Sequence, residues 1–217
     1  TKGKLYPISI NDNKIIRITD TNGITYLRGK LQINDVIPKE LYQFLPLFSD
    51  SLTQLGTASQ KYSEIEDEIK LYTGGISTHI NGYSNVKANN DIDLNLEVSG
   101  WALNSRTDKV IDMWTKVIGQ TDFIKNKDQL KILIKMLASS SISSVSESGH
   151  LFAMRHANAY FSKLKSINET MSGIEQLSFI MKLSKIVETG NEMAFDEEVL
   201  KPLLKLQEII LLSLIHI

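Results

Sequence analysis

Residues 91–103 alternate between apolar and polar side chains, and this alternation constrains the fold more than any other feature of the sequence. Successive side chains of a β-strand point to opposite faces of a sheet, so one face of this segment is buried and the other is largely polar. The pattern is typical of an antiparallel sheet that is covered on one side. The residues expected to face the covering layer are Ile92, Leu94, Leu96 and Val98.

Three other segments are predicted to be strands of the same sheet. Ile76–Tyr83 is the expected hairpin partner of the strand Asp91–Leu103, across a polar loop at Ser84–Asn90. Lys14–Ile18 and Ile24–Ile33 are expected to form a second hairpin around the turn Asp20–Gly23, because Asn-Gly readily takes the positive φ that tight turns need.

Helices are predicted between and after these strands. Pro38 suits a first helical position, Pro46 should kink or restart the helix, and Gly56 should end it. A second helix is expected over Tyr62–Tyr72, and everything after Ser105 reads as helical. The expected buried stripes are Leu41, Phe44, Leu45, Phe48, Leu52 and Leu55; Val110, Ile111, Trp114, Val117 and Ile118; Leu130, Leu133, Ile134 and Leu137; Ile174, Leu177 and Met181; and Leu203, Leu206 and Ile210. The fold class is therefore α+β, a mainly antiparallel sheet covered by helices on one face, with a helical C-terminal extension.

The stretch Ser139–Ser148 contains seven serines, and two interpretations of it are open. By composition it is a linker or a domain boundary. Ile142 and Val145 nevertheless keep a thin apolar pattern, which would suit a poor stretch of one long helix.

Composition excludes several function classes. The formal net charge of the 217 residues is -1 and acids and bases are mixed, so neither nucleic acid nor an anionic membrane is an expected partner. There is no cysteine, which removes disulfides and thiolate zinc ligands. The longest apolar run, Ile209–Ile215, is far shorter than the roughly 20 residues that span a bilayer.

The residues by themselves do not disclose a reaction. His150 and His156 would lie on different helix faces, so they are not expected to share a metal ion. Glu147 and His150 could share a face; a surface ion pair is favoured, and an independent enzyme that uses both is the rival interpretation. His79 lies in a predicted strand without an acidic neighbour, and Gly74-Gly75 lacks the pattern of a phosphate loop.

Four stretches, in this order, resemble the mitochondrial presequence protease family of pitrilysin-type zinc metallopeptidases, the inverzincins. They are Leu45–Thr57, Tyr72–Ser77, Ser148–Ala153 and Ile167–Phe179, within a similarity that runs from about Leu5 to Leu206. The resemblance implies a clamshell of four related α/β domains around a peptide chamber, in which this chain is the third domain.

The resemblance also implies where zinc ligands would lie. In the family's catalytic domain, the H-x-x-E-H helix ends in Gly-Thr or Gly-Ser, and counting back from Gly56 places Leu47, Asp50 and Ser51 at the three motif positions. Leu47 and Ser51 cannot replace imidazole, and no glutamate occurs between Glu97 and Glu147 to supply the third ligand. The domain is therefore expected to be a degenerate copy with no catalytic, cofactor or metal site of its own; zinc is implied only for the parent protein.

The expected function is that of an inactive, non-catalytic chamber-wall domain in a hydrolase that degrades presequences and other short unfolded peptides. The alternative is a pitrilysin-fold scaffold or binding protein without peptidase activity. The resemblance implies the mitochondrial matrix as location, with the remaining domains of the parent chain and a peptide substrate as partners. Residues 1–190 are expected to form the degenerate domain and residues 191–217 a helical extension with a truncated or non-native tail, the chain being a fragment. Leu203, Leu206, Ile209 and Ile210 are expected to leave an apolar face uncovered and to promote self-association.

Overall fold

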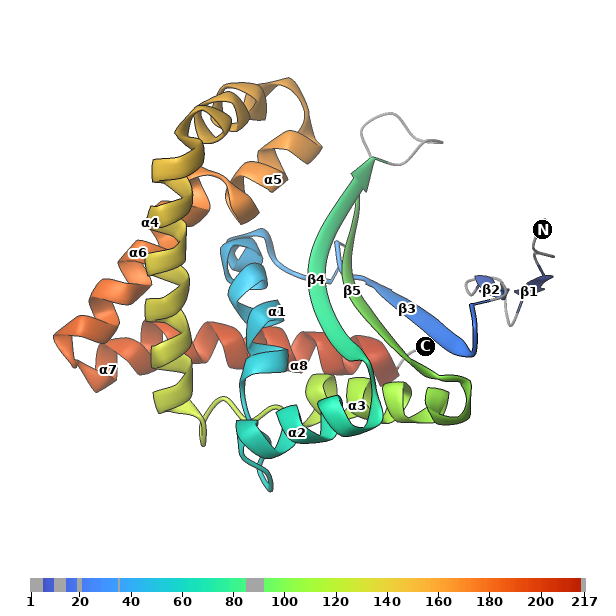
Figure 1. Ribbon diagram of the computed structural model, residues 1–217. Helices are drawn as coiled ribbons and strands as arrows, with labels where there is room; N and C mark the ends of the chain where they lie inside the picture. Colours follow the sequence, from blue (N-terminus) through green and yellow to red (C-terminus); the bar gives the residue numbers. More distant parts are fainter. Residues whose placement is uncertain (1–5, 10–14, 19–20, 35, 85–91, 216–217) are drawn as a thin grey trace.

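The computed structural model describes residues 6–9, 15–18, 21–34, 36–84 and 92–215. Its centre is a three-stranded antiparallel sheet in the order β3 (Ile24–Gln32), β5 (Ile92–Leu103) and β4 (Gly75–Ser84) (Figure 1). The register pairs Leu96 of β5 with Leu31 on one side and with Ile80 on the other. The alternation in residues 91–103 thus belongs to the central strand, and the prediction for Ile92, Leu94, Leu96 and Val98 is confirmed, since all four are buried. Asp91 lies outside the described residues.

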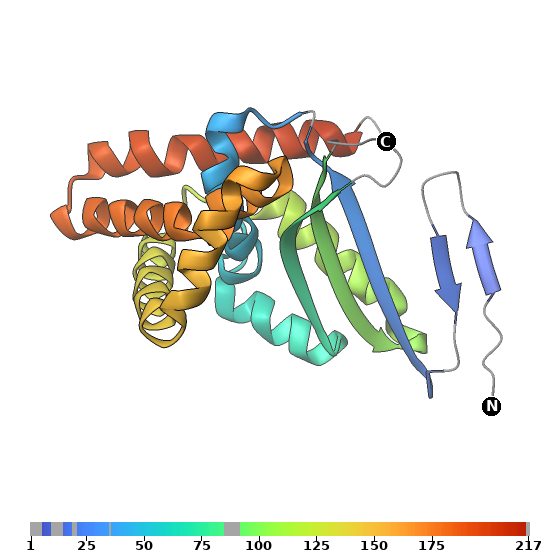
Figure 2. The same ribbon diagram turned by 90° about the horizontal axis from the view of Figure 1, so that it is seen from above.

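Helices cover one face of this sheet, which confirms the α+β class (Figure 2). The chain enters the covering layer through a 3₁₀ turn, η1 (Lys39–Phe44), and continues as α1 (Leu45–Gln54) with Pro46 in its first turn. Pro46 restarts the helix as predicted, because a missing N–H costs nothing in a first turn. α1 packs on β4, and α3 (Thr107–Gln120) packs on β5. α2 (Tyr62–Tyr72) has the predicted bounds.

The remaining helices form a second body of structure on the same core (Figure 1). They are α4 (Lys127–Asn158), η3 (Ala159–Phe161), α5 (Lys163–Ser172), α6 (Ile174–Thr189), α7 (Glu192–Phe195), the π-helical η4 (Asp196–Leu200) and α8 (Lys201–Ile215), and η2 (Asn104–Arg106) precedes α3. Leu130, Leu183 and Leu203 join the cluster that also contains Leu45 and Leu94, so sheet and helices bury one continuous set of apolar side chains. Within the described part of the chain, no helix is both long and apolar enough to cross a membrane.

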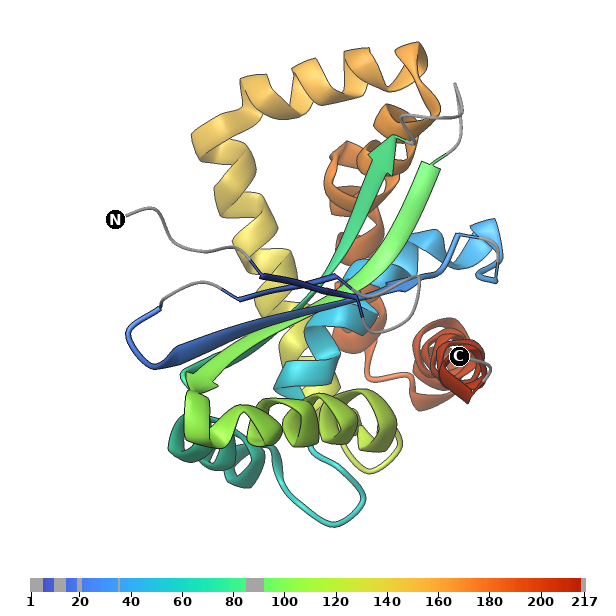
Figure 3. The same cartoon turned by 90° about the vertical axis from the view of Figure 1, so that its right-hand side faces the viewer.

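The serine-rich stretch is helical, which settles its two interpretations in favour of one long helix. The hydroxyls of Ser143, Ser144 and Ser146 bond back to carbonyl groups one turn earlier. Ser148 leaves helical geometry, with φ −136° and ψ 30°, and Figure 3 shows α4 changing direction along its length. A helix that satisfies its serines internally and kinks at the last of them needs no linker.

The first predicted hairpin is wrong. β2 (Ile15–Ile18) pairs with β1 (Tyr6–Ser9) in a separate two-stranded sheet, and not with β3. The turn itself is present, with positive φ at Asn22 and Gly23. The Gly23 carbonyl, however, accepts a hydrogen bond from Asn104 N–H at the end of β5. The turn therefore opens the β3–β5 ladder, whose long-range pairing short-range turn chemistry does not reveal.

Two predictions about helix faces are also wrong. Leu203, Leu206 and Ile210 of α8 are fully buried, because that helix packs against η1 and α1, so the uncovered apolar face and the self-association inferred from it lose their basis. In α3, Ile111 is exposed and Met113 is buried instead, because the helix turns its Val110–Met113–Val117 side to the sheet. The boundary proposed at residue 190 stays a prediction.

Candidate functional site

The three motif positions lie on α1, but two of them face the core. Leu47 is buried, and Ser51 is fully buried with its hydroxyl donating to the Leu47 carbonyl oxygen at 2.7 Å. An aliphatic side chain and a hydroxyl that is already bonded to backbone do not fit zinc, which takes imidazole, thiolate or carboxylate ligands. Among the residues that the structure describes, no three His, Asp or Glu side chains are grouped so that they could hold a metal ion. The lack of a metal site in the chain stays a prediction.

Glu147 and His150, the pair of the rival enzyme interpretation, are both exposed on α4. The non-helical residue Ser148 lies between them. Within the described residues, no hydrogen bond or ion pair joins the two side chains, and neither lines one of the larger cavities. A nucleophile and base pair need hydrogen-bond contact and a cleft, so this arrangement gives the pair no catalytic geometry.

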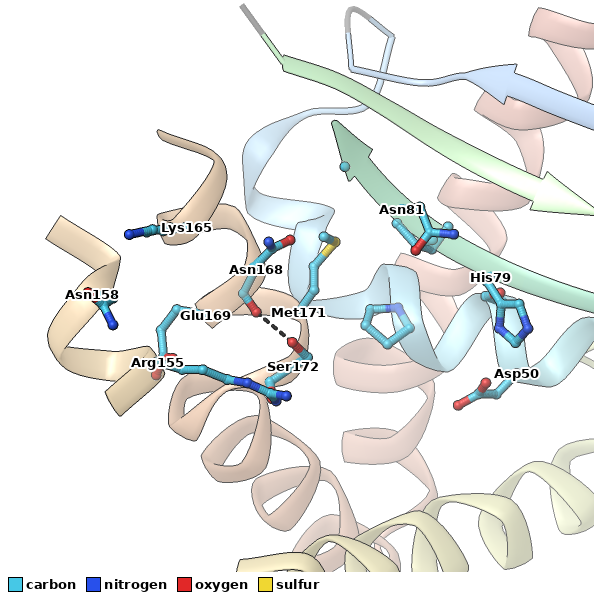
Figure 4. A pocket seen from close by; sticks show the side chains of 14 residues that line it. Asp50, His79, Asn81, Arg155, Asn158, Lys165, Asn168, Glu169, Met171 and Ser172 are labelled. Carbon is cyan, nitrogen blue, oxygen red and sulfur yellow. Dashed lines mark hydrogen bonds between the residues drawn. The ribbon is translucent and has the colours of Figure 1, made fainter. Parts of the chain in front are cut away.

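The largest cavity lies where the sheet meets the two helical parts, with a volume of about 630 Å³ (Figure 4). Four elements line it: α1, β4, the C-terminal part of α4, and α5. Asp50 and His79 contribute to one end, where Figure 4 places them close together, and Arg155 and Lys165 lie toward the other. The cavity combines carboxylates, cations and amides, which indicates a polar ligand or a wet interface rather than an apolar one.

Asp50 is the only one of the three motif positions that reaches this cavity. Burial raises the pKa of its carboxyl group, and the nearby His79 opposes that shift. No pattern in the sequence indicated this pair, because the two residues are brought together only when β4 packs beside α1. A lone half-buried carboxylate can accept hydrogen bonds, but without a metal it cannot make water a good nucleophile at neutral pH.

Glu169 lies at the wall of the cavity and fixes the junction of α5 and α6. Its Oε1 accepts hydrogen bonds from the backbone N–H of Ile174 at 2.9 Å and from His156 Nδ1 at 3.0 Å, so it caps the start of α6. A Cβ atom on Gly173 would lie 1.9 Å from Glu169 Oε2, which explains the glycine. The thirteen-residue separation of His156 and Glu169 carries no signal in the sequence. This cluster holds the wall in place and has no open coordination position.

The uncovered face of the sheet carries a second polar cluster, around Glu97. Lys30 Nζ lies 2.9 Å from one Glu97 carboxylate oxygen, Tyr83 Oη donates to the same oxygen at 2.7 Å, and Asn81 Nδ2 donates to the other at 3.1 Å. Burial opposes ionisation of Glu97, but these hydrogen bonds outweigh it and hold its pKa below the ordinary value. Hydrogen bonding to Glu97 raises the pKa of Lys30 in turn. Both carboxylate oxygens are engaged, which is typical of a structural ion pair.

Comparisons with known proteins agree with the four stretches noted in the sequence. The family described as peptidase M16, subfamily C, associated matches residues 4–183. The mitochondrial presequence protease of Saccharomyces cerevisiae is 49% identical over 208 residues, which are 96% of this chain and 21% of that protein. The protein of the same name from Kluyveromyces lactis is 49% identical over 207 residues, 95% of this chain and 21% of its own length. The chain thus spans about a fifth of the length of the relatives that it matches.

Proposed function

The chain belongs to the family associated with subfamily C of the M16 peptidases, and from this premise we propose that it is a non-catalytic wall domain of a peptide-degrading metallopeptidase. One observation carries the proposal: nearly all of this chain aligns with only a fifth of each relative. A segment that aligns in this way acts as part of a larger enzyme, and its own α1 has Leu47 and Ser51 turned into the core. The catalytic groups would then come from the rest of the parent protein, where zinc would activate the attacking water.

The physical work of such a wall is to enclose and position. A closed chamber admits short unfolded peptides and excludes folded proteins by size, and it holds the peptide in a geometry that lowers the entropic cost of reaction. The names of the relatives, "Presequence protease, mitochondrial", support presequence peptides as substrates and a mitochondrial location. A pitrilysin-type arrangement of domains is part of this proposal.

Peptide hydrolysis tests the proposal when it is measured on the full-length parent protein and on this chain alone. A quenched fluorescent peptide should be cleaved by the full-length protein and not by the 217-residue chain. The double variant Glu147→Ala, His150→Ala of the full-length protein should keep kcat/KM within about two-fold, because both side chains are exposed and unpaired with each other.

Two results would contradict the proposal. A full-length protein that is folded but cleaves no peptide, and that lacks an H-x-x-E-H motif outside this segment, would show the scaffold alternative to be correct. Cleavage by the isolated chain that disappears in the double variant would establish the independent enzyme instead.

A further inference from the structure

One edge of the sheet has unused backbone hydrogen-bonding groups. In an antiparallel sheet, each residue directs both its N–H and its C=O to the same side, and successive residues alternate. Ile33 N–H donates to the Leu94 carbonyl at 2.8 Å, so the even-numbered residues of β5 serve β3 and the odd-numbered ones serve β4. The β4–β5 register then turns the backbone groups of Thr78, Ile80 and Gly82 away from the sheet.

These outward groups are unpaired in the part of the chain that the structure describes. β4 has only β5 as a neighbouring strand, and no backbone hydrogen bond is formed by Thr78, Ile80 or Gly82 on the open side. Thr78 does bond to α1, but through its side chain, whose Oγ1 donates to the Ser49 carbonyl at 2.7 Å. An edge with three alternating, unsatisfied donor and acceptor pairs matches one kind of partner, another extended backbone.

The large cavity runs beside this edge. Its walls include β4 residues 79–82, Pro46 and Asp50 of α1, and Asn168 of α5 (Figure 4). Gly82 marks a close approach of α5, because a Cβ atom there would lie 2.8 Å from Leu164 Cδ1. Helices therefore flank the open edge on both sides. A slot of this form admits a single strand but excludes the whole sheet of a second copy of this chain.

We propose that the open edge of β4, from Thr78 to Gly82, binds an extended peptide segment as an added strand in this slot. The inference deepens the proposed chamber-wall function and rests on it for the source of the peptide. Two carboxylates, Asp50 and Glu169, and two cations, Arg155 and Lys165, line the slot, so their formal charges balance. Recognition would therefore come mainly from the peptide backbone and would tolerate many sequences.

Amide hydrogen exchange of the 217-residue chain tests the mode of binding directly. The probe is an unstructured eight-residue peptide of alternating threonine and lysine, carrying a fluorescein label. At saturation, the amides of Thr78, Ile80 and Gly82 should exchange at least about ten-fold more slowly, because they gain a hydrogen-bond partner. Those of His79 and Asn81, which already face β5, should change little. Equal changes at both sets, or none, would overturn the inference.

Edge prolines provide matched variants for fluorescence anisotropy. Ile80→Pro removes one outward N–H from β4, and Arg28→Pro removes the corresponding group from the opposite edge of the sheet, on β3. Ile80→Pro should weaken peptide binding about ten-fold or more, whereas Arg28→Pro should leave it unchanged. Ile80→Val keeps the N–H but loses a methylene, so it should bind normally and separates the edge effect from lost packing. Equal affinity of Ile80→Pro and Arg28→Pro would refute the β4 edge as the site.

The outcome is distinguishable from the fate of the proposed function. Peptide binding is measured on this chain and needs no hydrolysis, whereas the function is tested by hydrolysis in the full-length protein. Cleavage by the parent with no peptide protection of the β4 amides would reject the edge site alone. Protection of those amides together with an inactive parent would reject the protease role and keep the edge site.

Discussion

Glu97 is a buried carboxylate on the face of the sheet that carries the exposed polar side chains, and its neighbours keep it ionised. Lys30, Asn81 and Tyr83 each approach it from a neighbouring strand. Because its pKa is lowered by folding, its contribution to stability is fully present above its ordinary pKa of 4.5 and is lost as the pH falls below that value. At the residue scale this cluster links sheet pairing to pH.

Glu97→Gln should therefore lower the free energy of unfolding at pH 7 by about 1–2 kcal/mol, because the charge-assisted hydrogen bonds are weakened. Urea denaturation at pH 7, 5 and 3.5 measures the effect. The difference between variant and parent chain should shrink as the pH falls through the acid range. Glu147→Gln, which alters an exposed glutamate, is the control and should show no such trend. A difference that stays constant with pH would contradict the ionic role of Glu97.

Two leucines of the same strand separate burial from composition. Leu94 is 0% exposed and Leu103 is 58% exposed, so an aspartate enters the core at one position and water at the other. Leu94→Asp should cost several kcal/mol of stability, and Leu103→Asp less than about 1 kcal/mol. Thermal unfolding followed by circular dichroism measures both. Similar melting temperatures for the two variants would argue against the sheet orientation described above.

At the scale of elements, two glycines show how helix geometry is set locally. Gly190 ends α6 in the left-handed region, at φ +66°, whereas Gly119 lies within α3 with helical geometry. Nothing lies within 4 Å of a Cβ atom added at either position, so packing does not distinguish them. The backbone conformation alone does.

Alanine at these two positions should have opposite effects. Gly190→Ala should destabilise the chain by about 1 kcal/mol, because a side chain is strained at positive φ. Gly119→Ala should stabilise it by about 0.5 kcal/mol, because alanine has the higher helix propensity. Chemical denaturation of both variants under one condition tests the pair. Two changes of the same sign would mean that the α6 terminus is not built as described.

At the scale of the whole molecule, sheet and helices share one core, while polar side chains gather in the slot between them. The chain should fold without metal, because Leu47 and Ser51 face the core and the described residues contain no cluster of metal ligands. A chelator should leave its melting temperature unchanged, and metal analysis after dialysis should find well under one zinc per chain. About one equivalent of zinc, lost in Asp50→Asn, would overturn the degenerate-domain interpretation.

Local patterns in the sequence were sufficient for the central strand, for the bounds of α2 and for the restart at Pro46, because each depends on side-chain period or on one residue's backbone chemistry. The family resemblance likewise rested on short stretches, and the family match confirms it. Tertiary structure alone decided the partner of β2, the burial of α8 and the meeting of Asp50 with His79. These depend on which distant segments pack together, and an amphipathic face or a strand edge shows that a partner is needed without showing which one.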